Sequence, residues 1–237
     1  MSNENNVPLS KIYPSGLLNL FPGLEEIRGR ITNEQKTVSA ITKPENLNFA
    51  IEDLISITRI LTSGINESKL STHSLLKKVA GPSIKAGIKN PLEAWTVGKV
   101  TKTSGITDFV LLSDQRKINR HNPAKSIDDL TILLQRISPG VTTIHHYQKQ
   151  GIKLFLTLEK DIVFEINNKI YRPKTLEEVI VILPGDKFRL WREGGGTASN
   201  LIISAYGISP EVISSPFLGR GMENFFPRTK RQFSINM

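Results

Sequence analysis

The side chains best suited to chemistry in this sequence are few and lie far apart. Asp161 and Glu165 are four residues apart on one predicted strand, so their carboxylates would share a sheet face and could approach a metal ion. Metal-dependent nucleases combine an Asp with a Glu-x-Lys pair, but here Lys169 follows Glu165 by four residues and a turn at 167–168 separates them. We interpret both carboxylates as ordinary charges on the polar face of a strand.

The four histidines do not form a metal site. His145 and His146 are neighbours on a predicted strand, so their imidazoles point to opposite faces of the sheet and cannot both bind one ion. His73 and His121 have no Cys, His or acidic residue at ligand spacing. The chain has no Cys, which excludes disulfides, Fe–S clusters and cysteine nucleophiles. We therefore predict no catalytic residue, no cofactor and no metal.

Three consecutive glycines at 194–196, followed by Thr197, have the composition of a loop that cradles phosphate. No Lys-Ser or Lys-Thr pair follows them, and no helix is predicted to begin there, so backbone donors would not converge on one phosphate. The pattern favours a flexible hairpin.

The charge suggests a polyanionic partner. The 237 residues include 31 Lys and Arg against 22 Asp and Glu, a formal charge of +9, and Lys and Arg bind phosphates without reading base sequence. The alternative is that these are ordinary solvated side chains. The predicted nucleic-acid-binding residues, for RNA or single-stranded DNA, are Arg116, Lys117, Arg120, Lys125, Arg228, Lys230 and Arg231.

The ends of the chain are predicted to be arms rather than domains. Residues 1–43 mix Pro and Gly with short apolar pieces, and only a short helix near 24–29 is compatible with them. Residues 211–237 carry Phe among Arg and Lys, which could stack on bases but fits docking on a neighbouring subunit or on the chain itself better. No segment is apolar for long enough to span a bilayer, and the N-terminus does not resemble a signal peptide.

A helical segment is predicted over residues 44–93. Apolar residues at three- and four-residue steps indicate an amphipathic helix at about 45–62, ending before Gly64. A second helix follows, and either Asn66 or Ser71 can cap it.

A β domain is predicted over residues 94–210, because the apolar period shortens to two and turn residues recur every 8–14 positions. Residues 126–137 are ambiguous, but Ser126 with Asp129 three residues later resembles a helix cap, and the Leu spacing favours a helix over a strand. The predicted strands are 95–102, 108–112, 141–147, 152–158, 162–166, 179–183, 187–192 and 200–206.

The hairpins of residues 140–207, with their Pro-Gly-Asp turn before the penultimate strand, resemble the strand succession of a jelly roll or cupin barrel. Cupin enzymes hold a metal with two His and a Glu from one motif and a His from a second. Here no Glu follows His145 and His146 at that offset, and Gly185–Asn200 contains no His. The same strand order without a metal resembles single jelly-roll virion proteins, whose arms make subunit contacts.

We therefore predict an α+β chain dominated by an antiparallel jelly-roll-like sandwich or barrel, acting as a non-enzymatic capsid-type subunit. The resemblance implies self-association into a homo-oligomer and a location in a virion or host cytoplasm. Two alternatives stay open. Leu112-Ser113-Asp114 is similar to the Leu-x-Asp signature of plant-virus movement proteins, which bind nucleic acid, and the strand order also allows a cupin-like enzyme.

Overall fold

The computed structural model describes residues 16–33, 44–79, 100–103, 105–117, 126–148, 151–208 and 230–235. Within these ranges the chain forms helices first and strands afterwards. The helices are Gly16–Leu20 (α2), Leu24–Asn33 (α3), Pro44–Glu67 (α4) and Thr72–Val79 (α5). The strands are Val100–Thr103 (β1), Ile106–Lys117 (β2), Ser126–Ile137 (β3), His146–Tyr147 (β4), Ile152–Thr157 (β5), Ile162–Ile166 (β6), Lys169–Tyr171 (β7), Glu178–Ile182 (β8), Lys187–Arg192 (β9), Ala198–Ile208 (β10) and Gln232–Ser234 (β11).

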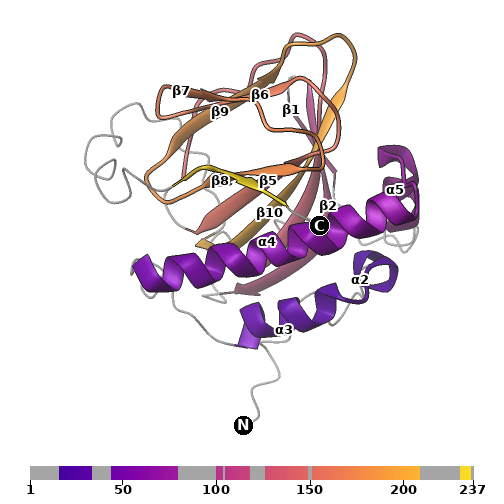
Figure 1. Ribbon diagram of the computed structural model, residues 1–237, viewed down its shortest axis with the longest axis vertical. Coiled ribbons are helices and arrows are strands. Elements are labelled where there is room, and N and C mark those ends of the chain that lie inside the picture. The colour runs from indigo at the N-terminus through magenta and orange to yellow at the C-terminus, as the bar shows by residue number, and fades with distance from the viewer. Residues whose placement is uncertain are drawn as a thin grey trace.

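The strands form two antiparallel sheets that face each other (Figure 1). One has the order β1-β2-β3-β10-β5-β8-β11 and the other the order β4-β9-β6-β7. From β3 to β10 the chain passes repeatedly between the two sheets, so β3-β10-β5-β8 opposes β4-β9-β6-β7 as the two halves of a jelly roll. The predicted α+β, jelly-roll-like fold is confirmed, as a sandwich that does not close into a barrel.

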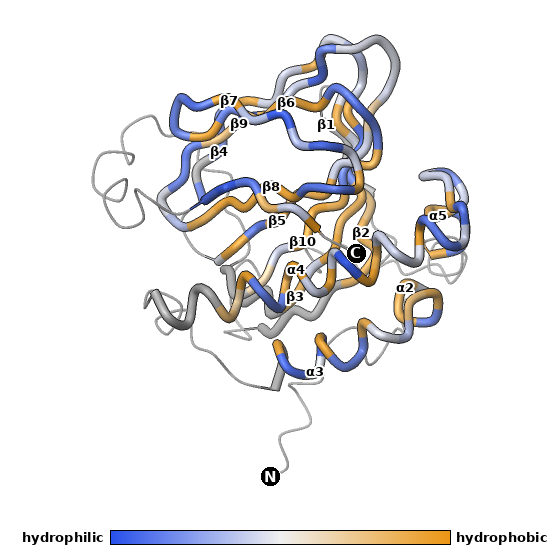
Figure 2. The backbone as a smooth tube through the Cα atoms, viewed as in Figure 1, coloured by the Kyte–Doolittle hydropathy of each residue, from blue (hydrophilic) through white to orange (hydrophobic). Residues whose placement is uncertain are grey.

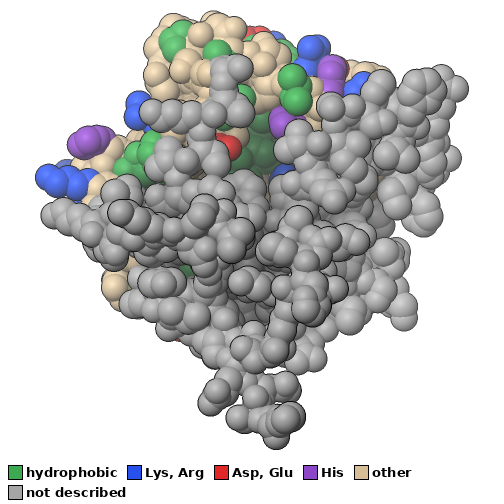
Figure 3. All heavy atoms as spheres, turned by 180° about the vertical axis from the view of Figure 1, so that it is seen from behind, with side chains coloured by type: hydrophobic (Ala, Val, Ile, Leu, Met, Phe, Trp, Pro, Cys, Tyr) green, Lys and Arg blue, Asp and Glu red, His purple; other side chains and the backbone are tan. Residues whose placement is uncertain are grey.

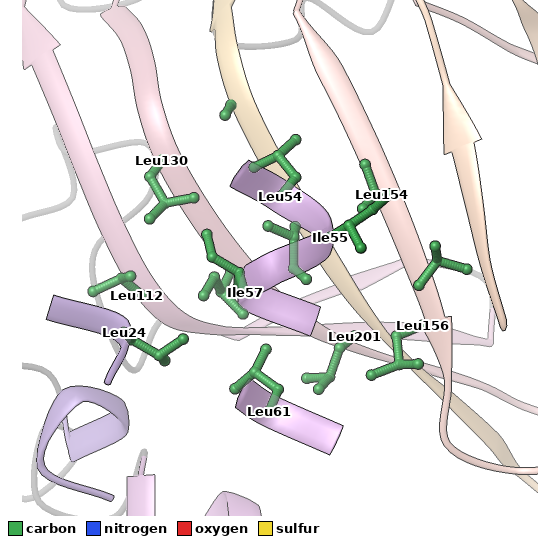
Figure 4. Close-up of a cluster of buried hydrophobic side chains, with 14 of the residues drawn as sticks. Leu24, Leu54, Ile55, Ile57, Leu61, Leu112, Leu130, Leu154, Leu156 and Leu201 are labelled. Atoms are coloured by element: carbon green, nitrogen blue, oxygen red, sulfur yellow. The ribbon is translucent and has the colours of Figure 1, made fainter. Parts of the chain in front are cut away.

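The helices cover the outer face of the seven-stranded sheet (Figures 1 and 4). Pro44 opens α4 in the first-turn position that suits proline, and Ser71 caps α5 by accepting a hydrogen bond from the Ser74 amide at 3.2 Å. Helices and strands share one hydrophobic cluster, so the helices belong to the same core as the sheet. Its members in Figure 4 include Leu24 of α3, Leu54, Ile57 and Leu61 of α4, and Leu130, Leu154 and Leu201 of the sheet.

Helix α4 continues beyond the predicted end at Gly64, as far as Glu67. A Cβ atom on Gly64 would lie 2.3 Å from the ring of Phe21, which is 4% exposed. Glycine at this position therefore lets Phe21 pack directly on the helix backbone. The residue marks a close approach of the arm to α4 rather than a helix end.

The predicted helix at 126–137 is wrong, because these residues form the central strand β3. β3 pairs with β2 on one side and with β10 on the other. Leu130 and Leu134 contribute to the cluster under the helices, while Leu133 and Ile137 contribute to the cluster between the sheets. A strand buried on both faces carries apolar residues without strict alternation, so its Leu spacing resembled that of a helix.

The other predicted strands agree with the structure to different degrees. Strands β6 and β9 have the predicted bounds, 162–166 and 187–192. The predicted strand at 141–147 is reduced to β4 and one isolated bridge between Thr142 and Trp191. Strands β7 and β11 were not predicted, and most of the predicted strand at 95–102 lies outside the described residues.

The space between the two sheets is filled mainly by hydrophobic side chains. Phe155 of β5 packs edge-on against Phe164 of β6 and Phe188 of β9, with ring centroids 5.2 and 5.8 Å apart. Hydrophobic residues dominate the sheet strands, whereas hydrophilic residues gather at several turns (Figure 2). This interior is therefore an apolar core in which any polar side chain needs a reason to be present.

Residues 230–235 add the edge strand β11 to the seven-stranded sheet. Phe233 pairs with Val179 of β8, and Ile235 is 4% exposed in the core under the helices. Docking on the chain's own sheet is one of the two uses predicted for the tail. In the described part of the chain, no helix has the length and apolar character needed to cross a membrane.

Candidate functional site

The residues predicted to bind nucleic acid do not form one group among the described residues. Arg231 is 8% exposed, and its guanidinium donates to Asp186 Oδ1 at 3.0 Å, which gives it a structural role. Lys230 is exposed, with its ammonium 5.4 Å from the ring centre of Phe233. Contact with nucleic acid stays a prediction. Arg116 and Lys117 end β2, and Arg120, Lys125 and Arg228 lie outside the described residues.

His145 and His146 lie on opposite faces of the four-stranded sheet, as the alternation predicts. His146 stacks on Phe188 in the interior, with ring centroids 5.4 Å apart. On the outer face, His145 Nε2 lies 3.9 Å from Glu165 Oε1, and Glu165 Oε2 accepts a hydrogen bond from Arg189 Nε at 2.7 Å.

The described residues do not fit the metal centre that a cupin fold implies. No group of three or more His, Asp or Glu side chains that could hold an ion occurs among them. Asp161 precedes β6, with a positive φ of 68°, so it does not share a strand face with Glu165. Of the two neighbouring imidazoles, that of His146 faces the interior and that of His145 faces outward. We therefore derive no chemistry through a metal ion.

A row of polar side chains crosses the interior face of the seven-stranded sheet. The register aligns Asp108 of β2 with Gln135 of β3, Gln135 with Asn200 of β10, and Asn200 with Thr157 of β5. We call these four residues the polar row. Because side chains two residues apart share a sheet face, their hydrophobic neighbours place the row inside the sandwich. Those neighbours are Val110, Leu133, Ile202 and Phe155, which all belong to the hydrophobic cluster between the two sheets, called the interior cluster below.

Most of the polar row lacks hydrogen-bond partners. Gln135 Nε2 donates to Asp108 Oδ1 at 3.0 Å. By contrast Gln135 Oε1, Thr157 Oγ1 and both polar atoms of the Asn200 side chain have no partner among the described residues. Asn200 and Thr157 are 0% exposed. A buried polar group without a partner costs about 1–3 kcal/mol, so a row of them calls for a group that completes it.

Two titratable groups near the row have shifted pKa values. Burial raises the pKa of Asp108, against the lowering effects of the Gln135 hydrogen bond and the charge of Lys153. Burial, followed by the charges of Lys153 and His145, lowers the pKa of His146 to about 4, so its imidazole is uncharged at neutral pH. The Lys153 ammonium also lies 5.9 Å from the ring centre of Phe188. The charge of Lys153 therefore acts both on Asp108, at one end of the row, and on His146.

On the part of the face in Figure 3 that is coloured, hydrophobic side chains lie beside acidic, basic and His side chains. Charged and apolar groups therefore meet at this surface. This mixture suits the recognition of a small molecule that has both polar and apolar parts.

The polar row was missed at the level of the sequence because three of its four members, Gln135, Asn200 and Thr157, are amides or a hydroxyl within or at the end of apolar strands. The available signal is weak: Gln135 and Asn200 lie within mostly apolar segments, and Thr157 ends another. Only the strand register brings them side by side, and register depends on pairing between segments far apart in the chain.

Neither a protein-family model nor a curated protein sequence matches this chain. Among solved structures, it is similar to the cupin domain of Cnp3 from Schizosaccharomyces pombe, with 13% identity over 45% of this chain and 67% of that one, at a TM-score of 0.35. A predicted oxalate decarboxylase from Thermotoga maritima matches with 15% identity over 45% of this chain and 91% of that one, at 0.36. A sugar phosphate isomerase from a cupin superfamily of Silicibacter pomeroyi matches with 12% identity over 43% and 59%, at 0.33.

These findings contradict the prediction of a capsid-type subunit and its movement-protein alternative, because the similar structures named above are a cupin domain, a predicted oxalate decarboxylase and a protein from a cupin superfamily rather than virion proteins. They also overturn the prediction that the chain is not an enzyme, since enzymes occur among the matches. At these TM-scores the likeness carries no activity over to this chain. What the chain does must be argued from its own jelly-roll sandwich and polar row.

Proposed function

We propose that this chain binds a small polar molecule inside the sandwich, along the polar row. The observation that carries the proposal is Asn200, which is 0% exposed and has no partner for either its Oδ1 or its Nδ2 atom. A carboxamide in this state loses its hydrogen bonds to water and gains none from the protein. A ligand with hydroxyl, carbonyl or amide groups would supply both a donor and an acceptor.

The neighbouring residues support a ligand of this kind. Gln135 Oε1 offers an acceptor on one side of Asn200, and the Thr157 hydroxyl offers a donor and an acceptor on the other. Phe155, which lies two residues before Thr157 on the same face of β5, supplies an aromatic surface for the apolar part of a ligand. The row thus combines a few polar groups with an apolar wall, as small-molecule sites do.

Thr157→Val is expected to weaken ligand binding about two- to tenfold, since one neutral hydrogen bond contributes about 0.5–1.5 kcal/mol. The measurement is the thermal shift of the full chain with a panel of small polyols, amides and hydroxy acids, followed by titration of the compounds that stabilise it. Without ligand, Thr157→Val is expected to be as stable as the wild type or more so, because it removes an unpartnered buried hydroxyl.

Thr62→Val is the matched control. Thr62 of α4 is also 0% exposed with an unpartnered Oγ1, but it lies in a helix outside the sandwich interior. It should leave ligand binding unchanged. A panel in which no compound stabilises the wild type would sink the proposal, as would equal loss of binding in both variants.

A second candidate function is catalysis of proton transfer on the same ligand. It is favoured by the uncharged imidazole of His146 and the raised pKa of Asp108, both influenced by Lys153. A carboxyl pKa that is raised toward neutrality suits a general acid, and an uncharged imidazole is available to accept a proton, although its lowered pKa makes it a weak base. The test is NMR of a ligand found in the panel, incubated in D2O with the protein. Catalysis predicts deuterium at a carbon position, lost in His146→Gln; no exchange with the wild type rejects it.

Acid is expected to destabilise the protein through His146, whose pKa falls from 6.5 to about 4 on folding. Between these values the folded state binds fewer protons than the unfolded state, so this contribution to stability is present above pH 6.5 and is lost as pH falls toward 4. The melting temperature of His146→Gln should decline less over this window than that of the wild type. His73→Gln, at an exposed position of α5, should follow the wild type; identical profiles for all three proteins would refute the assignment.

A further inference from the structure

We propose that the ligand of the polar row is an anion, with a carboxylate or a phosphate that Arg192 binds. The inference rests on the proposed function, since it assigns the charge of the same ligand. It follows from the position of Arg192, from its lack of partners and from the glycines beside it.

Arg192 lies at the same end of the sandwich as Asn200 and Thr157. It is the last residue of β9 and alternates with Phe188 and Leu190, whose side chains belong to the interior cluster. Its strand partner Ile162 begins β6 and also belongs to that cluster. Short loops join Thr157 to Ile162 and Arg192 to Ala198, so these strand ends meet at one end of the sandwich.

The two loops at this end are bonded to each other and to the strands. The Glu193 amide donates to the Asp161 carbonyl at 2.9 Å, which joins loop 193–197 to loop 158–161. The Leu158 amide donates to the Ser199 carbonyl at 2.9 Å, and the Ser199 amide donates to Glu159 Oε2 at 2.6 Å. The end of the interior beside Asn200 is thus built from fixed backbone.

The Arg192 guanidinium has no ion pair among the described residues, and its buried Nε has no hydrogen-bond partner. It packs against the glycine loop: a Cβ on Gly194 would lie 3.4 Å from Nε, and a Cβ on Gly196 would lie 3.5 Å from Nη1. Arginine stays charged at any ordinary pH and matches the two oxygens of a carboxylate or phosphate. Asp161 Oδ2 also lies beside this loop, 2.6 Å from the same Cβ position on Gly194, but it forms no ion pair with Arg192 within 4.0 Å. A half-buried guanidinium with an unbonded Nε and no ion pair among the described residues therefore points to an anion from outside the chain.

The arrangement of charges also sets how the ligand lies. Asp108, the carboxylate of the polar row, is on β2, three strands from Thr157 in the order β2-β3-β10-β5. A negative group is therefore favoured at the Arg192 end and disfavoured at the Asp108 end. The uncharged hydroxyl or carbonyl groups of the ligand then lie along Asn200 and Gln135.

Isothermal titration calorimetry of the full chain with two pairs of probes tests the inference: lactate against lactamide, and glycerol 3-phosphate against glycerol. We expect at least one anion to bind about tenfold or more tightly than its neutral counterpart, since hydrogen bonds to charged groups contribute about 1.5–3 kcal/mol. The pair that shows the preference distinguishes carboxylate from phosphate. Arg192→Gln should abolish the preference.

Arg172→Gln is the control, because Arg172 is exposed, pairs with Glu193 beside the same loop and carries the same charge. It should keep the preference for the anion. Equal affinity of anionic and neutral probes for the wild type overturns the inference while leaving the proposed function in place. If both variants lose the preference, the preference is a general effect of charge, and the inference is overturned. If no probe binds, the result counts against both proposals.

Discussion

Asp186→Ala is expected to lower the free energy of unfolding by about 3–5 kcal/mol, the usual cost of breaking a buried ion pair from one side. Asp186 is 2% exposed and accepts hydrogen bonds from Arg231 at 3.0 Å, from Asn167 Nδ2 at 2.8 Å and from the Leu183 amide at 2.7 Å. The substitution removes the carboxylate partner of a guanidinium that is itself 8% exposed. It also disconnects the β6–β7 and β8–β9 turns from the C-terminal strand.

Urea denaturation measures the loss, and hydrogen exchange locates it. The Val181 amide donates to the Arg231 carbonyl at 2.8 Å, so its exchange should accelerate if β11 detaches. Glu193→Ala is the control, because it breaks an exposed pair with Arg172 and should change stability far less. Equal effects of the two substitutions would show that Asp186 does not hold the C-terminal strand.

Leu54→Ala is expected to cost about 2–5 kcal/mol, because it leaves a cavity between α4 and the seven-stranded sheet. Leu54 is 0% exposed and lies in the cluster that α4 shares with β3, β5 and β10 (Figure 4). The N-terminal helices would then contribute to the stability of the whole sandwich rather than forming a separate unit.

The comparison is with Phe49→Ala on the same helix. Phe49 is 62% exposed, so its removal should have little effect on the midpoint of urea denaturation, although the change in side-chain size is larger. A single cooperative transition shifted by Leu54→Ala is the expected result. A Leu54→Ala protein as stable as Phe49→Ala would mean that α4 does not pack on the sheet as described.

The sequence was a good guide where local signals decide the structure. Strands β6 and β9 were predicted with their observed bounds, because turn residues delimit both of them. It was a poor guide where burial against distant segments of the chain determines the secondary structure. The strand at 126–137 is covered on both faces, so its Leu residues carried no alternation, and β11 is a three-residue edge strand that exists only through pairing with β8.

The candidate site was less predictable than the fold. The residues that the sequence singles out are charged or His, whereas Asn200 and Thr157 are neutral. Their lack of hydrogen-bond partners becomes apparent only in the assembled sheets. The capsid interpretation failed for a related reason. It rested in part on an irregular N-terminal arm, whereas the described residues 16–33 of that segment form α2 and α3, which pack on the chain's own core.

The pairing of β3 with β10 has a consequence for how fast the chain folds. Ile127 meets Ile208 and Ile137 meets Ala198, and everything from β4 to β9 lies between the two partners in the sequence. A long loop must therefore close before the centre of the larger sheet gains its contacts, which places this topology among the slow folders, in the range of milliseconds to seconds. During that interval the Leu- and Ile-rich strand is open to pairing with other chains, so refolding yield should fall as protein concentration rises.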